Sequence, residues 1–232
     1  LLLATFRIMR AKMFGSEGYG LDPLGTEEIL HTLTTVDLAS HHRRLAVPNN
    51  GVISIFGDVK TSDIRAEVEK ALGLWLLGSE FKAHETTLPD PGMQRVVVER
   101  DKEQAVAVVG YRGCTFYDDD RYALELLGEA CSDMGSRLFL RIREELGLAY
   151  YVGANSQPGF TPGYVAFYAG TAPGQLEQVE KELLAEAAKL RQDGLTAAEL
   201  RRAKAKMIGQ KKIARQDFGG LAIAAGLDEL YG

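Results

Sequence analysis

The chain has 232 residues, 46% of them hydrophobic and 25% charged, so it can bury a substantial core and has the composition of an ordinary globular protein. Its net charge of −5 gives no electrostatic support for nucleic-acid binding. No apolar run approaches the roughly 20 residues of a membrane span.

The ends of the sequence both have helical patterns. The first residue is Leu1 rather than Met, and the last segment, 226–232, reads as a helix. We therefore expect the chain to be cut from a longer one at both ends. The absence of a targeting signal then says nothing about the compartment, which the sequence leaves unknown.

The first part of the chain alternates helical patterns with turns. Thr34 and Asp37 have the spacing of a capping box, which predicts a helix start. The β-branched run Val52–Phe56 follows a turn and predicts a strand. The helices expected here cover residues 2–14, 26–33, 36–46 and 61–75, the last with its stop near Gly73.

The periodicity dissolves between residues 77 and 94. This stretch contains Pro89 and Pro91, and it includes His84. A segment with prolines and no hydrophobic period is typical of a linker. We therefore predict a domain at 1–76, a linker at 77–94 and a second domain at 95–232.

In the second part, strand patterns stand beside strand patterns. Strands are expected at 95–100, at 104–113 and on both sides of a hairpin at 157–163. Helices are expected at 119–133, 137–146 and 175–194, and after a capping box at Thr196 and Glu199. Adjacent strands favour an α+β fold with largely antiparallel sheets covered by helices over a doubly wound parallel sheet.

The sequence lacks complete catalytic motifs. It has no phosphate-binding loop, no dinucleotide-binding glycine motif and no nucleophile elbow. The four histidines form neither H-E-x-x-H nor its inverse, and His41 and His42 point about 100° apart on a helix. Cys114 and Cys131 cannot form a zinc site alone and are expected to be free thiols in or near the core.

One arginine in the charged helix near residue 140 differs from its neighbours. On a helical wheel Arg141 can pair with Glu145 and Glu144, whereas Arg143 borders the apolar stripe beside Phe139 without an acidic partner. Arg143 is therefore either snorkelling or directed at something else.

Tyr150 follows seven residues after Arg143, beyond the break at Gly147. The simplest interpretation is a core tyrosine that shares a strand face with Val152 and Ala154.

The segment SRLFLRIREELGLAYYVGA, residues 136–154, resembles the second-domain signature of pitrilysin/insulysin-type zinc metallopeptidases, the family that includes mitochondrial processing peptidase. Residues 24–59 resemble the latter part of that family's first, zinc-bearing domain. One departure is EGYG at 17–20, where the family often has His-Pro-Tyr-Gly. The resemblance implies a two-domain metallopeptidase arrangement, truncated at both ends.

By this resemblance, Arg143 and Tyr150 match an Arg–Tyr pair that binds substrate and stabilises its transition state. The resemblance implies zinc in the parent protein, held by an inverted H-x-x-E-H motif that this chain lacks, so we expect no metal ligand here and no activity of the fragment alone. The implied partners are a peptide or unfolded-protein substrate and a related subunit in a homo- or heterodimer.

Two other interpretations stay open. The chain could come from a non-catalytic family member that lends these residues to a zinc-bearing partner or acts as a scaffold. It could also be an α+β interaction domain without an enzymatic role, in which Arg143 pairs with a structural carboxylate and the Tyr150 hydroxyl is buried.

Overall fold

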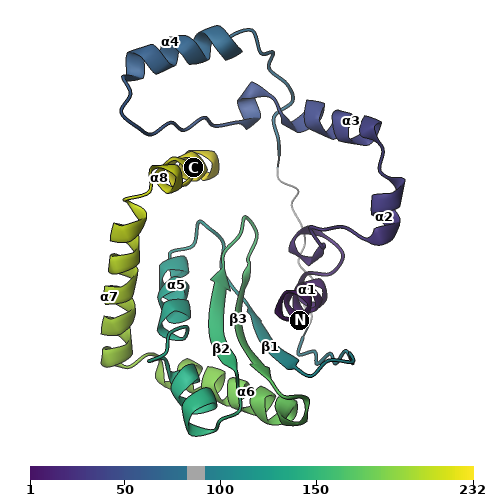
Figure 1. The fold of residues 1–232 in the computed structure, drawn as a ribbon, viewed down its shortest axis with the longest axis vertical. Helices are drawn as coiled ribbons and strands as arrows, with labels where there is room; N and C mark the ends of the chain where they lie inside the picture. Colours follow the sequence, from purple (N-terminus) through teal and green to yellow (C-terminus); the bar gives the residue numbers. More distant parts are fainter. Residues whose placement is uncertain (83–91) are drawn as a thin grey trace. The chain divides into compact units, whose positions relative to one another are not determined.

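A three-stranded antiparallel sheet forms the centre of the second half of the chain. Strand β3 (Tyr164–Thr171) lies between β1 (Ala105–Arg112) and β2 (Tyr151–Gln157) and pairs antiparallel with both. Figure 1 shows this sheet in a computed structural model, which describes residues 1–82 and 92–232. Helices and an antiparallel sheet confirm the expected α+β class.

The chain divides into two units, and the sheet belongs to the first, Leu1–Gly25 with Glu85–Met207. Helical elements precede, separate and follow the strands of this unit. They are α1 (Leu2–Phe14), η1 (Gly18–Gly20), α5 (Asp120–Ala130), η3 (Phe139–Glu145), η4 (Pro173–Gln175), α6 (Leu176–Asp193) and the first part of α7 (Ala197–Ala214).

In the second unit, Thr26–His84 with Ile208–Gly232, all the regular structure of the described residues is helical. Its helix α3 begins with the expected capping box: the Asp37 N–H donates to Thr34 Oγ1 at 3.3 Å, and the Thr34 N–H donates to Asp37 Oδ2 at 2.9 Å. The elements are α2 (Glu27–Thr32), α3 (Thr35–Leu45), η2 (Pro48–Asn50), α4 (Thr61–Leu72), α8 (Phe218–Tyr231) and the end of α7.

Two predicted strands are wrong. Residues 52–56 and 95–100 form no strand, although both are rich in β-branched residues. Val52, Phe56 and Val97 are exposed instead. Strand propensity describes how well side chains fit a half-buried pleated surface, and neither segment has a neighbouring strand to pair with among the described residues.

The domain boundaries at residues 76 and 95 stay a prediction. Of the expected linker, only 77–82 and 92–94 are described, and His84 lies outside the described residues. Residues 1–25, which the sequence places in the first domain, belong to the same unit as the sheet.

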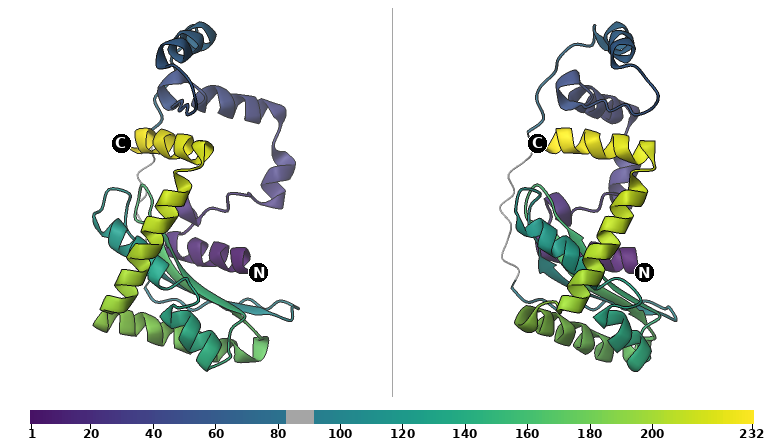
Figure 2. Two further views of the ribbon diagram at one scale, coloured as in Figure 1. Left: turned by 60° about the vertical axis from the view of Figure 1, so that its left-hand side comes forward. Right: turned by 90° about the vertical axis from the view of Figure 1, so that its left-hand side faces the viewer.

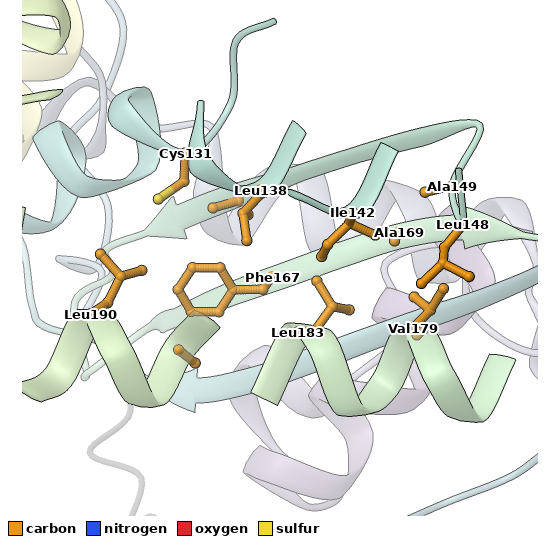
Figure 3. Close-up of a cluster of buried hydrophobic side chains, with 13 residues drawn as sticks. Cys131, Leu138, Ile142, Leu148, Ala149, Phe167, Ala169, Val179, Leu183 and Leu190 are labelled. Carbon is orange, nitrogen blue, oxygen red and sulfur yellow. The ribbon is translucent and has the colours of Figure 1, made fainter. Parts of the chain in front are cut away.

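The larger core fills the sheet face that α6 covers (Figure 3). Phe167 of β3 meets Leu183 of α6 and Ile142 of η3, and the two aliphatic side chains are fully buried. Burying a side chain of this size contributes about 1.5–3 kcal/mol. The core also contains Cys131, Leu138, Leu148, Ala149, Ala169, Val179 and Leu190. This packing fixes η3 on the sheet through one face and leaves its other face outward.

Helix α1 covers the opposite face of the sheet. Side chains alternate along β3, so Tyr164 and Ala166 point to this face and Phe167 and Ala169 to the other. Phe14 and Met13 of α1 pack with Tyr164 and Ala166 of β3, and Figure 2 shows α1 beside the sheet. Gly110 of β1 permits this approach, because an added Cβ would lie 2.3 Å from the sulfur of Met9.

None of the helices within residues 1–82 and 92–232 is both long enough and apolar enough to cross a bilayer.

Candidate functional site

The segment that carries Arg143 is a π-helix rather than the ordinary helix expected from the sequence. It spans Phe139–Glu145 and begins where the Phe139 N–H donates to Ser136 Oγ at 3.2 Å. The Leu146 N–H reaches back five residues to the Arg141 carbonyl at 3.2 Å, which is the wider π spacing. Because π-helical turns are frequent at functional sites, the exposed side chains of this segment are candidate functional residues.

Gly147 ends the segment in a left-handed conformation, with φ of 62°. Its N–H donates to the Arg143 carbonyl at 3.1 Å, and the Leu148 N–H donates to the Ile142 carbonyl at 2.9 Å. Leu148 and Ala149 are then buried in the core. The chain therefore leaves η3 at Glu145 and enters β2 at Tyr151, with only five residues between them, as the Gly-Leu-Ala sequence suggests.

Two arginines of this region are ion-paired. Arg137 is bonded to Glu199, which also caps α7 through Thr196. Arg141 lies 3.0 Å from Glu145, as expected, and 3.2 Å from Glu182 of α6 rather than pairing with Glu144. The Glu182 contact joins residues 41 positions apart, so no sequence spacing could have indicated it.

Arg143 differs from both. Its side chain is exposed, and its guanidinium carbon stacks 5.0 Å from the centroid of the Phe139 ring. Such stacking is worth about 0.5–1 kcal/mol at an exposed position and limits the directions in which the guanidinium can point. In the described part of the chain, no carboxylate lies within ion-pair distance of Arg143.

Tyr150 is not the core tyrosine of the simplest interpretation. Its side chain is 55% exposed, and β2 begins one residue later. Its backbone N–H donates to the Gly170 carbonyl at 2.8 Å, so the backbone before β2 is hydrogen-bonded to the sheet although the side chain is exposed. The structure thus exposes both Arg143 and Tyr150, and the aromatic ring on which Arg143 stacks is that of Phe139 rather than that of Tyr150.

The histidines and acids of the described segments do not converge on one point. Within residues 1–82 and 92–232, no three His, Cys, Asp or Glu side chains are placed to hold an ion. His41 contacts Arg44 at 3.4 Å, and His31 contacts Glu27 at 3.8 Å on an exposed helix. The described residues therefore do not fit a zinc ion, which needs three or four converging ligands.

Both cysteines lie in the core, as expected, and are free thiols. Burial raises the pKa of Cys131 to about 12 and also raises that of Cys114. Neither thiol has the low pKa of a nucleophile or a metal ligand.

Comparison with known proteins places this arrangement in a family. The peptidase M16 inactive domain family matches residues 32–207. A protein of Bacillus subtilis named as an uncharacterized zinc protease is 30% identical over 94% of this chain and 53% of its own length. A protein of Streptomyces coelicolor that is also named as an uncharacterized zinc protease is 30% identical over 94% of this chain and 49% of its own length. The chain thus spans about half the length of the curated relatives it matches.

Solved structures share the fold. The peptidase M16 inactive domain structure from Pseudomonas fluorescens has a TM-score of 0.85 at 20% identity, over 98% of this chain and 55% of that one. A protease from Helicobacter pylori has a TM-score of 0.76 at 21% identity, over 94% and 54%. The sequence match to the family covers more than half of the chain and agrees with this fold, so the chain belongs to the peptidase M16 inactive domain family.

Proposed function

We propose that this chain is the part of a zinc-dependent endopeptidase that supplies Arg143 and Tyr150 for substrate binding, while the zinc site lies in another part of the complete protein. The substrate is a peptide or an unfolded protein. The relatives that are named zinc proteases are about twice as long as the matched region, which leaves room for a separate catalytic half.

The observation that carries the proposal is that Arg143 has no ion-pair partner among the described residues, whereas Arg137 and Arg141 are ion-paired. The guanidinium of Arg143 stacks on the Phe139 ring, so its orientation is restricted although the side chain is exposed. The interaction-domain interpretation required a paired Arg143 and a buried Tyr150, and neither side chain has that environment.

The chemistry suits peptide substrates. A guanidinium presents a planar fork of N–H donors, so Arg143 can hold carbonyl oxygens of an extended peptide. The Tyr150 hydroxyl can donate to the oxygen that becomes anionic when the peptide carbonyl is attacked, and one such donor is typically worth about 10²–10³ in kcat. The ligands for zinc have to come from elsewhere, because the described residues hold no suitable set.

A second candidate is a non-catalytic subunit that lends the same residues to a zinc-bearing partner in a homo- or heterodimer, or that serves as a scaffold. The family description "inactive domain" favours this candidate over an interaction domain unrelated to proteolysis. The two candidates differ in whether the zinc half belongs to the same chain.

The experiment uses the complete protein and the 232-residue chain with a quenched-fluorescence peptide substrate. The isolated chain is expected to be inactive. In the complete protein, or in the complex with its zinc-bearing partner, Tyr150→Phe should lower kcat and Arg143→Met should lower kcat/KM at least about tenfold.

Arg141→Met is the matched control. It removes the same charge two residues before Arg143, and the Arg141 side chain is already ion-paired with Glu145 and Glu182. Zinc-dependent hydrolysis by the isolated chain would contradict the division of roles. Unchanged kinetics of Arg143→Met would remove the role assigned to that residue.

A further inference from the structure

A pocket of 720 Å³ lies within the first unit, between the start of α1, the adjoining loop, α5 and the sheet. Its volume is within the range of about 300–1,000 Å³ that small-ligand sites occupy. It lies apart from the π-helix, and neither Arg143 nor Tyr150 lines it. The Arg–Tyr proposal therefore does not account for it.

Most charged side chains around the pocket already have partners. Arg7 donates to Asp22 Oδ2 at 2.7 Å, and Asp22 also accepts the Leu24 N–H at 3.1 Å. These bonds, with the backbone bond from Leu24 as the larger cause, hold the pKa of Asp22 below its usual value. Glu129 of α5 lies 2.7 Å from Lys206. These groups form the frame of the pocket.

Arg10 is the exception on the α1 side. Its side chain is partly buried and lines the pocket, and its Nε is buried without a hydrogen-bond partner among the described residues. No carboxylate of the described chain lies within ion-pair distance of it. An N–H of a guanidinium that is withdrawn from water and left unbonded costs free energy. Arg10, unlike Arg7, therefore has hydrogen-bonding capacity that the described chain does not use.

The wall next to Arg10 is aromatic. Phe6 of α1 packs against Tyr168 with ring centroids 5.7 Å apart and against Tyr164 at 6.0 Å. All three rings line the pocket, as do Leu2 and Leu3. An apolar body seated here would remove both its own surface and these rings from water, at about 25 cal/mol per Å² of area.

We propose that this pocket binds a peptide through a carboxylate on Arg10 and an apolar side chain on Phe6 and Tyr168. The carboxylate is either the C-terminal one or that of an acidic residue beside the apolar one. A carboxylate matches the fork of a single arginine. The carboxylates of Asp22 and Glu125, which also line the pocket, repel any anion, but they repel a phosphate dianion more strongly than a singly charged carboxylate. This binding goes beyond the proposed function, because it needs neither zinc nor hydrolysis.

The test measures fluorescence anisotropy of labelled peptides with the 232-residue chain. The probe is an N-terminally fluorescein-labelled Gly-Gly-Leu-Phe with a free C-terminus, compared with its C-terminal amide. The free acid should bind at least about tenfold more tightly than the amide, which corresponds to one charge-assisted hydrogen-bonded contact. A third peptide, an amide with Glu before the Phe, recovers the affinity only if a side-chain carboxylate is accepted.

Arg10→Met should abolish the difference between acid and amide. Lys12→Met is the matched control: it removes a charge from the same helix at an exposed position that does not line the pocket, and it should bind as wild type does. Circular dichroism verifies that both variants fold. The acid–amide comparison on the wild-type chain is informative even if Arg10→Met does not fold.

Equal affinity of acid and amide for the wild-type chain would overturn the proposal, as would the absence of binding by either. An acid–amide difference that survives in a folded Arg10→Met variant would also overturn it.

Discussion

Arg137 and Glu199 form a two-pronged ion pair that ties the segment before η3 to the start of α7. Arg137 Nε donates to Glu199 Oε1 at 2.7 Å, Nη2 donates to Oε2 at 2.5 Å, and both side chains are largely buried. Glu199 also accepts the N–H and the hydroxyl hydrogen of Thr196, both at 2.8 Å. A single carboxylate thus completes a helix cap and a tertiary contact 62 residues apart in sequence.

This ion pair should make the free energy of unfolding decrease at acidic pH. The hydrogen bond from Arg137, followed by those from Thr196, lowers the pKa of Glu199 from 4.5 to about 2. Because the folded pKa is depressed, the stabilisation is fully present above about pH 4.5 and is lost as the pH falls through about 2. Urea unfolding between pH 6 and pH 2 measures it, and Glu199→Gln should reduce the slope of unfolding free energy against pH.

The control for this prediction is Glu144→Gln, which removes an exposed carboxylate of η3. Its pH slope should match that of wild type. If Glu199→Gln and wild type lose stability in parallel between pH 4.5 and 2, the pair does not carry the predicted linkage.

The main core should be sensitive to one side chain of α6 and indifferent to its neighbour. Leu183 is fully buried against Phe167, whereas Leu184 is 42% exposed. Leu183→Ala removes buried methyl groups and leaves a cavity, which costs about 2–5 kcal/mol. Leu184→Ala should change the free energy of unfolding by no more than about 0.5 kcal/mol. Urea denaturation of both variants decides, and equal losses would mean that α6 does not face the sheet as described.

The sequence predicted the elements whose signals are local. The capping boxes at Thr34 and Thr196, the helix stop at Gly194 and the strands around 157–163 all depend on neighbours a few residues away. The strands expected at 52–56 and 95–100 failed because a strand needs a partner that local propensity cannot supply.

The site divides in the same way. The helical wheel predicted that Arg143 has no acidic partner within its helix, because the positions four residues before and after it, Phe139 and Gly147, are read directly from the sequence. Tertiary packing of η3, β2 and α1 produces the π-helical geometry, the exposure of Tyr150 and the pocket at Arg10. Residue spacing in the sequence therefore could not predict them.

The two thiols should be unreactive while the protein is folded. With a pKa of about 12, Cys131 is thiolate in roughly one molecule in ten thousand at pH 8, and its side chain is fully buried. Cys114 is 8% exposed and has its pKa raised, first by burial and then by Asp118. Ellman's reagent should therefore detect no fast thiol in the native chain and two in urea. Cys131→Ala should leave one in urea, and rapid labelling of native Cys131 would show that the core opens.

The turn that joins η3 to β2, between Arg143 and Tyr150, should require glycine at position 147. With φ of 62° and nothing within 4 Å of an added Cβ, Gly147→Ala introduces backbone strain without a steric clash. The left-handed conformation costs a residue with a Cβ about 1–2 kcal/mol. Asn tolerates this region better, so Gly147→Asn should lose less than Gly147→Ala.

Gly174 provides the matched comparison, since its added Cβ also meets open space but its φ is outside the left-handed region. Gly174→Ala should be neutral or slightly stabilising, because it reduces the freedom of the unfolded chain without native strain. Urea unfolding of the three variants separates the two effects. Equal stability of Gly147→Ala and Gly174→Ala would mean that the turn relaxes, and the positions of Arg143 and Tyr150 would then not be fixed by this glycine.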